Sequence, residues 1–292
     1  MFNLNLMKFL IGFCLLTSSC KKDSSINPNE QVTQNNDIAA RAATDNILMG
    51  NPSNASTLST TNYLMQKTTY TLSYNSSQGK PNWVSWHLDN TWLGSTTRCD
   101  CFATDVLLPT GVYRVSSSSY TGSGFDRGHN CPSGDRTFSS TDNRETFLMT
   151  NMMPQAPNNN QQTWEKLESY CRKLVSQGNE CYIICGSYGV GGTGSNGTKT
   201  TLDAGRVTVP KQIWKVVLVL PAGTNDVSRV NTSTRVIAVN TPNINTIVTS
   251  TWGGYRTSVD AIEAATGYDI LSILPDDVES TLESRVDNGA TL

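Results

Sequence analysis

The sequence predicts a mixed α+β domain, from three observations. Runs typical of strands come before and after one strong amphipathic helix, and no internal repeat divides the chain. Of the 292 residues, 37% are hydrophobic, with six Trp and ten Tyr, which is enough to bury a sizeable core. Only 16% are charged, and a chain in which Ser, Thr, Asn and Gly replace charges is typical of an exported, loop-rich protein.

The first twenty residues predict export. Lys8 precedes an apolar run from Phe9 to Leu16, and small residues follow up to Cys20. This pattern is typical of a signal peptide, and the run is too short to span a membrane. The ending LTSSC resembles a bacterial lipobox, which would make Cys20 the lipid anchor of an envelope or surface lipoprotein. A plain secretory signal, giving a secreted or periplasmic protein, is the alternative.

The chain after the signal peptide divides into a tether and one domain. Residues 21–55 are polar and cannot form a core, so they predict a flexible tether, with the signal peptide over residues 1–20 and the domain over residues 56–292. Residues 259–292 hold eight of the 24 acidic residues and one of the 22 basic ones. The body is therefore mildly basic, which permits a phosphate-binding face without requiring one. The sequence carries no signal for the oligomeric state.

The elements follow in order along the domain. Two alternating runs predict strands over residues 68–75 and 82–88, joined by a turn. The clearest helix covers residues 159–178, which the asparagines at 158–160 can cap and Gly178 can end. The segments that follow predict buried strands and a helical end: strands over residues 181–189, 213–221 and 234–240, then two short helices around Pro275.

Six cysteines follow the signal peptide: Cys99, Cys101, Cys131, Cys171, Cys181 and Cys185. An even number in an exported protein predicts disulfides, and six cysteines allow fifteen pairings. Cys181 and Cys185 lie about 13 Å apart in one strand. A disulfide needs Cα atoms within about 7 Å, so these two do not pair with each other. Paired C-x-x-C spacings are lacking, which disfavours a zinc cluster. We expect Cys131 and Cys171 to be disulfide members rather than nucleophiles.

The segment FDRGHNCP, residues 125–132, places one of only two histidines, His129, in a polar, turn-prone stretch. Further along, Glu168 falls within about 40° of Trp164 on the helix and so borders its buried stripe. A carboxylate there needs a partner or a cation. Mg²⁺ keeps most of its waters and accepts few protein oxygens, so Asn160 and Glu168 would suit it. The other histidine, His87, lies in a strand and is expected to be structural.

These residues, in this order, resemble the DNA/RNA non-specific endonuclease family with the ββα-metal (His-Me finger) nuclease fold. The family has D-R-G-H, then N-x-x-P-Q, a second Asn nine residues after the first, a Trp, and a Glu four residues beyond it. Here Asn151 and Asn160 are nine apart, and Glu168 stands four residues after Trp164. The resemblance implies an α+β fold with a central antiparallel or mixed sheet and helices packed on it.

The resemblance also implies a role for each matching residue. His129 is the general base that activates water, Asn160 is the direct ligand of Mg²⁺, and Glu168 orients the waters around the ion. Mn²⁺ or another divalent ion is the alternative to Mg²⁺. The remaining roles are these: Asn151 supports the site, Arg127 contacts phosphate or braces the loop, Arg98 stabilises charge on the phosphate, and Asp126 braces the loop.

The function expected from this set is hydrolysis of phosphodiester bonds in DNA and RNA with little sequence specificity. Contacts to backbone phosphates rather than bases would make cleavage independent of sequence. A lipid-anchored binding or adhesion module with the same fold is one alternative. A phosphodiesterase for small diesters is another, which a closed pocket rather than an open groove would indicate.

Overall fold

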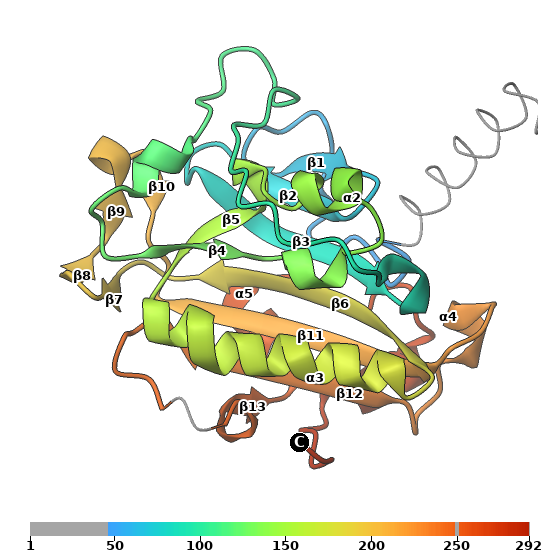
Figure 1. Ribbon diagram of the computed structural model, residues 1–292. Coiled ribbons are helices and arrows are strands. Elements are labelled where there is room, and N and C mark those ends of the chain that lie inside the picture. The colour runs from blue at the N-terminus through green and yellow to red at the C-terminus, as the bar shows by residue number, and fades with distance from the viewer. Residues whose placement is uncertain (1–45, 249–250, 292) are drawn as a thin grey trace, which may run out of the picture. The chain divides into compact units, whose positions relative to one another are not determined.

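The computed structural model describes residues 46–248 and 251–291 (Figure 1). The predicted signal peptide, Cys20 and most of the predicted tether lie outside these residues. Across the described ranges, no helix has both the length and the apolar character needed to cross a bilayer.

The predicted end of the tether differs from the structure, because residues 46–55 pack on the domain. The sequence analysis assigned them to a flexible segment, yet Met49 and Ala55 are buried. The Asn46 side chain accepts a hydrogen bond from the backbone of His87 at 3.1 Å and donates one to the carbonyl of Thr68 at 3.0 Å. These few anchoring side chains are too sparse to produce a periodic pattern. Packing on the domain therefore begins by residue 46.

A seven-stranded antiparallel sheet lies at the centre of the domain, which confirms the α+β class. Five of its strands match the predicted segments, and the two edge strands were not predicted. The strands in spatial order are β1 (Tyr63–Gln66), β2 (Thr71–Asn75), β3 (Lys80–Leu88), β6 (Asn179–Tyr188), β11 (Gln212–Pro221), β12 (Arg235–Pro242) and β13 (Arg256–Thr257).

Helices cover both faces of this sheet (Figure 1). Along β6, Cys181 packs on the face covered by α3 (Glu165–Ser176), and its neighbour Tyr182 packs on the opposite face with α5 (Val259–Thr266) and α6 (Asp276–Glu283). Because both faces are buried, the central strands carry unbroken apolar runs, such as Cys181–Cys185 in β6 and Val216–Leu220 in β11. The two predicted C-terminal helices are confirmed.

A second ribbon carries the D-R-G-H segment. β4 (Asp126–His129) pairs antiparallel with β5 (Met152–Gln155), and the chain then enters the helical segment that ends in α3. This succession forms a ββα unit. The sequence analysis did not predict this ribbon, because a pairing across more than twenty residues leaves no local pattern.

The predicted helix over residues 159–178 is confirmed, with a difference at its start. Its first turn is a π-helix, Asn159–Trp164, and α3 follows; Gly178, with φ of 89°, ends it as predicted. The preceding asparagines do not cap it through their side chains. They tie the helix start to the end of β12 and the loop beyond, because Asn158 bonds Asn245 and Asn159 bonds Thr241.

One disulfide forms among the described residues, between Cys99 and Cys101. The prediction that Cys131 and Cys171 are disulfide members is wrong, and the prediction that Cys181 and Cys185 do not pair is confirmed. Buried thiols pack as small apolar side chains. The free cysteines, all in the core beside α3, are Cys131, Cys171, Cys181 and Cys185.

The remaining elements are short and lie mainly at the margins of the sheet. The short elements are β7 (Gly192–Gly194), β8 (Gly197–Lys199), β9 (Thr201–Leu202), β10 (Val207–Thr208), α2 (Ser140–Glu145), α4 (Asp226–Arg229) and 3-10 turns at Asn90–Trp92, Ser117–Tyr120, Ser133–Asp135, Met149–Asn151, Asp203–Gly205 and Gly253–Tyr255.

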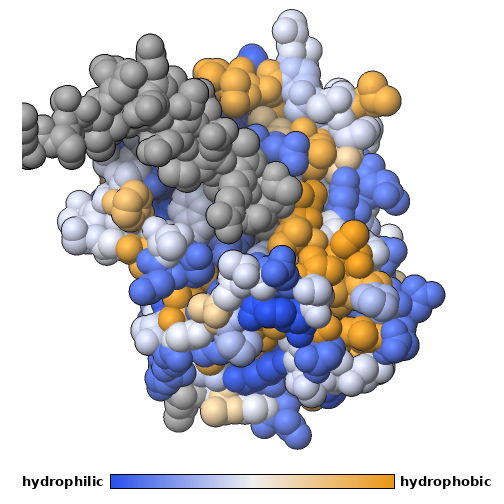
Figure 2. Space-filling model, turned by 90° about the vertical axis from the view of Figure 1, so that its right-hand side faces the viewer, coloured by the Kyte–Doolittle hydropathy of each residue, from blue (hydrophilic) through white to orange (hydrophobic). Residues whose placement is uncertain are grey.

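On the face drawn in Figure 2, hydrophobic patches alternate with hydrophilic ones, in keeping with the low charged fraction.

Candidate active site

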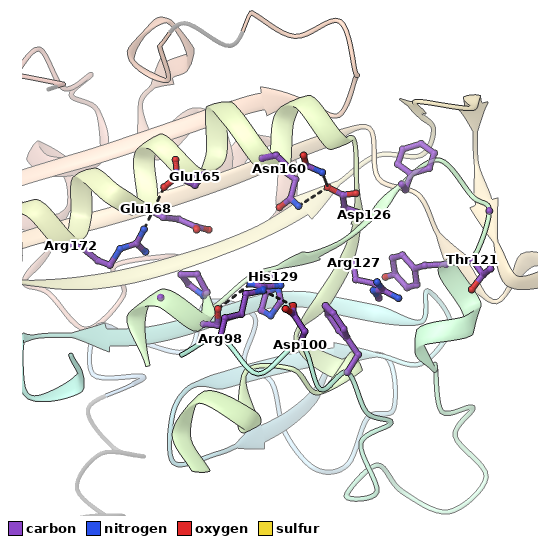
Figure 3. A pocket seen from close by; sticks show the side chains of 18 residues that line it. Arg98, Asp100, Thr121, Asp126, Arg127, His129, Asn160, Glu165, Glu168 and Arg172 are labelled. Carbon is purple, nitrogen blue, oxygen red and sulfur yellow. Dashed lines mark hydrogen bonds and ion pairs between the residues drawn. The ribbon is translucent and has the colours of Figure 1, made fainter. Parts of the chain in front are cut away.

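A cleft of about 750 Å³ runs between the ββα ribbon, the π-helical turn and α3 (Figure 3). Six of the seven residues to which the sequence analysis gave a role line it: Arg98, Asp126, Arg127, His129, Asn160 and Glu168. The side chains of Asp100 and Glu165 at its rim are 67% and 51% exposed, so the cleft opens to solvent.

Strand β4 carries His129 into the cleft. In this strand Arg127 and His129 point to one side, and Asp126 points to the other. Gly128 between them is required by packing, since a Cβ at this position would lie 2.3 Å from Oε1 of Gln155. The D-R-G-H segment is therefore a strand held tightly against β5, and it fixes where the imidazole lies.

The imidazole of His129 is 8% exposed and packs edge-on against Phe147, with ring centroids 4.8 Å apart. Burial lowers the pKa of His129 to about 3, the positive charge of Arg98 adds to this, and the charge of Arg127 contributes further. A hydrogen bond to the Arg127 backbone acts in the opposite direction. The ring is therefore neutral at pH 7 and able to accept a proton. Its Nε2 is buried and has no partner within the described ranges.

Two arginines stand beside the imidazole. Arg98 donates to Asp100 at 2.7 Å and to the hydroxyl of Ser133 at 3.1 Å, and its side chain remains 49% exposed. Arg127 stacks over the ring of Phe102 at 4.3 Å. Both guanidinium groups line the cleft, where they offer positive charge to an anion.

Asn160 lies across the cleft in the π-helical turn, a distortion that occurs frequently at functional sites. Its Nδ2 donates to Oδ2 of Asp126 at 2.8 Å, and Gln161 donates to the same oxygen at 2.8 Å. Asp126 therefore orients the Asn160 amide, so that the carbonyl oxygen Oδ1 is left to face a cation. The sequence analysis gave Asp126 a role in bracing the loop and did not predict this contact.

Glu168 lies on α3 at the inner side of the cleft, with a side chain 12% exposed. Burial raises its pKa, and the charges of Lys215 and Arg172 oppose this. Lys215 is fully buried on β11, 3.5 Å from the Glu168 carboxylate and 4.3 Å from the ring of Trp164. The sequence analysis expected a partner or a cation beside this carboxylate, and Lys215 is such a partner.

Asn151 supports the site from outside the cleft. It is fully buried, accepts a hydrogen bond from the backbone of Cys131 at 3.0 Å, and donates to the carbonyls of Cys131 and Thr146, both at 2.8 Å. It therefore fixes the chain just after His129. His87 is structural as expected, because it pairs with Glu180 at 3.0 Å and stacks on Tyr182.

The sequence analysis missed two charged residues of this site. Lys215 stands alone in the apolar run of β11, and a single lysine in a buried strand is a signal that could have revealed it. Arg172 lies one helical turn after Glu168 and pairs with Asp135 at 2.9 Å. Asp135 in turn accepts from the indole of Trp86 at 3.0 Å.

Comparisons with known proteins agree with this geometry. Residues 50–277 match the model of the DNA/RNA non-specific endonuclease family. The chain belongs to that family. This endonuclease is 49% identical to a nuclease of Nostoc sp. (strain PCC 7120) over 244 residues, which cover 83% of this chain and 86% of the relative. It is 34% identical to the mitochondrial nuclease EXOG of Mus musculus over 52% of this chain and 42% of the relative.

The fold of the endonuclease is also found in a solved structure of the EndoG/EndoGI complex. The TM-score is 0.65 at 21% sequence identity, and the match covers 80% of this chain and 93% of the other. At this identity the likeness concerns the fold alone, and it confirms the predicted ββα-metal architecture.

Nucleases of this family depend on a divalent metal ion, and the cleft has donors that fit one. Oδ1 of Asn160 and the carboxylate of Glu168 are hard oxygen ligands, and both line the cleft. The hydrogen bond from Asn160 to Asp126 leaves the oxygen, rather than the nitrogen, of that amide for the ion. The residues present are therefore compatible with the metal that the family requires.

Proposed function

We propose that this endonuclease is exported and Mg²⁺-dependent, and that it hydrolyses phosphodiester bonds of DNA and RNA with little sequence specificity. The observation that carries this is a neutral imidazole, His129, beside two cleft-lining arginines, with Asn160 and Glu168 across the cleft. Mn²⁺ or another divalent ion is the alternative to Mg²⁺.

In the proposed mechanism the arginines bind the scissile phosphate and His129 takes the proton of the attacking water. Arg98 and Arg127 neutralise the anion that would otherwise repel the nucleophile. A neutral imidazole has one protonated nitrogen and one with a free lone pair, and the nitrogen with the free lone pair accepts the proton. Loss of such a base typically costs on the order of 10² to 10⁴ in rate.

Asn160 and Glu168 would hold the metal ion, Asn160 directly and Glu168 through water. When bound, the ion supplies positive charge at the transferring phosphorus and the leaving oxygen. Asp126 keeps Oδ1 of Asn160 directed at this position, and Lys215 holds the Glu168 carboxylate in place. Asn151 acts only through the backbone around Cys131.

The open rim of the cleft favours a polymer over a small diester. Asp100 and Glu165 are largely exposed, so the cleft is open to solvent rather than enclosed, as a polymer substrate requires. The arginines offer contacts to phosphate rather than to base edges, which supports cleavage with little sequence specificity.

The test is digestion of supercoiled plasmid and of total RNA with Mg²⁺ and with EDTA, by wild type, His129→Ala and His87→Gln. We expect cleavage of both substrates to need metal, to fall by at least about 100-fold in His129→Ala, and to persist in His87→Gln. Added imidazole should restore part of the lost rate in the alanine variant. Folded wild type that cleaves neither substrate with any divalent ion would refute the proposal.

We also propose that the protein acts outside the cytoplasm, anchored through a lipid on Cys20 or secreted. The signal-like first twenty residues and the Cys99–Cys101 disulfide support this, because disulfides persist in oxidising compartments. Cell fractionation of wild type and Cys20→Ser tests it. Wild type in the membrane fraction and Cys20→Ser released would support the anchor, and both variants in the cytosol would exclude export.

A further inference from the structure

Three carboxylates meet on the face of the sheet opposite the active site. Asp260 and Glu263 come from α5, and Glu283 comes from the end of α6. One oxygen of each lies within 4.8 Å of the others. Since α5 and α6 cover one face of the sheet and α3 covers the other, this cluster is separate from the catalytic cleft.

Glu283 is the member that calls for an explanation. It is only 7% exposed, and its Oε1 has no hydrogen-bond partner among the described residues. Burial raises the pKa of Glu283 to about 8, the charges of Glu263 and Glu279 and a hydrogen bond with Glu263 add to this, and a hydrogen bond from the Leu271 backbone opposes it. Burial likewise raises the pKa of Glu263, with Asp269 and Asp260 as its charged neighbours. The side-chain charges acting on this pair are thus all negative.

The other buried carboxylates differ from Glu283 in having a basic partner. Within the described ranges each of them pairs with a basic side chain: Asp105 with Lys67, Asp135 with Arg172, Glu180 with Arg229, and Asp287 with Arg235. Buried charges are normally paired or bound to a metal, because a bare one is costly. Glu283 has no basic partner in the part of the chain that the structure describes, although Asp287, four residues later, has two, Arg235 and Arg256.

We propose that Asp260, Glu263 and Glu283 bind a divalent cation, Ca²⁺, that joins α5 to α6. Ca²⁺ takes six to eight oxygen ligands in a flexible shell, and three carboxylate oxygens within 4.8 Å of one another can supply part of it. Mg²⁺ demands a near-ideal octahedral shell, which carboxylates from two separate helices meet less readily. Asp260 is exposed, which leaves room for the waters that complete a Ca²⁺ shell.

The role of this ion is structural. Leu282, next to Glu283, and Ile262, next to Glu263, pack in the same apolar cluster under the sheet. A cation between the two helices would remove the repulsion that opposes this packing, so its binding stabilises the C-terminal segment.

The test compares thermal unfolding of metal-stripped protein at pH 8.5, with EDTA or millimolar Ca²⁺, for wild type, Glu283→Gln and Asp277→Asn. Asp277 lies on the same helix and is exposed, so its variant removes one acidic charge outside the cluster. At about 100-fold excess over Kd we expect Ca²⁺ to raise the Tm of wild type and Asp277→Asn by about 5–10 °C. Glu283→Gln should lose this shift and be more stable than wild type in EDTA.

Equilibrium dialysis separates this site from the catalytic one. Glu283→Gln should bind one Ca²⁺ fewer per chain than Asp277→Asn. If Glu283→Gln does not accumulate, the exposed Asp260→Asn should weaken Ca²⁺ binding by at least about tenfold. Equal Ca²⁺ stoichiometry in all variants would overturn the proposal. So would a wild type that Ca²⁺ leaves unchanged but acid stabilises, because the cluster would then hold a proton instead of a cation.

Discussion

The contact between Asp126 and Asn160 offers the sharpest test of how the site is built. Asp126→Ala removes the acceptor that orients the Asn160 amide through a 2.8 Å hydrogen bond. A hydrogen bond to a charged group contributes about 1.5–3 kcal/mol, and each 1.4 kcal/mol is a factor of ten in an equilibrium constant. If that energy holds Oδ1 toward the ion, the Mg²⁺ concentration for half-maximal cleavage should rise by roughly 10- to 100-fold.

The assay is plasmid cleavage as a function of Mg²⁺ concentration. Asp126→Ala should recover most of its rate at high Mg²⁺, since His129, Arg98 and Arg127 are untouched. Gln161→Ala is the matched control, because it removes the other hydrogen bond to the same carboxylate oxygen and leaves Asn160 in place. A normal Mg²⁺ dependence with a lower maximal rate in Asp126→Ala would show that Asp126 does not act through the metal ligand.

Three further outcomes follow from the structure. Gly128→Ala should destabilise the protein by about 1–3 kcal/mol in urea unfolding, because its Cβ would lie 2.3 Å from Gln155; an unchanged midpoint would contradict this. Arg98→Ala should raise the pKa of His129 above about 3, because the charge of Arg98 lowers it. NMR titration of the two histidines measures this pKa, and an unchanged value for His129 would contradict the prediction. Without reductant, alkylation should reach the four buried thiols only after unfolding; these are Cys131, Cys171, Cys181 and Cys185. Their labelling in folded protein would argue against the observed packing.

The central strands and helices of the fold could be predicted because their patterns are local. Residues 181–185 and 216–220 form unbroken apolar runs, as is typical of strands buried on both faces. The ribbon of β4 and β5 could not be predicted in this way. Its strands have four residues each and pair across a long separation, and Gly128 makes β4 resemble a turn.

The cysteines show where compositional reasoning fails. An even number of cysteines in an exported chain favours disulfides, yet that statistic contains nothing about side-chain direction. Cys181 and Cys185 face the same apolar cluster as Cys171, in a space where small side chains fit against α3. Whether a thiol fills a core or joins a disulfide depends on packing, and packing is settled only by the whole fold.

For the site, motif spacing pointed to residues that line one cleft and missed the charged residues that hold them in place. His129, Asn160 and Glu168 do line one cleft. Lys215 comes from a strand nearly fifty residues after Glu168 in the chain, and no motif links the two. The contact follows from the packing of α3 on β11, because a buried carboxylate and a buried ammonium stabilise each other only when the fold brings them together.

The low pKa of His129 is consistent with a general base once the substrate is considered. A base works best when its pKa lies near the operating pH, and a pKa of about 3 is far below it. Part of that lowering comes from Arg98 and Arg127, the two groups proposed to bind phosphate. A bound phosphodiester would neutralise them and raise the pKa of the imidazole. His129 would then become basic where the substrate is present, while in free enzyme the ring stays unprotonated and ready to accept.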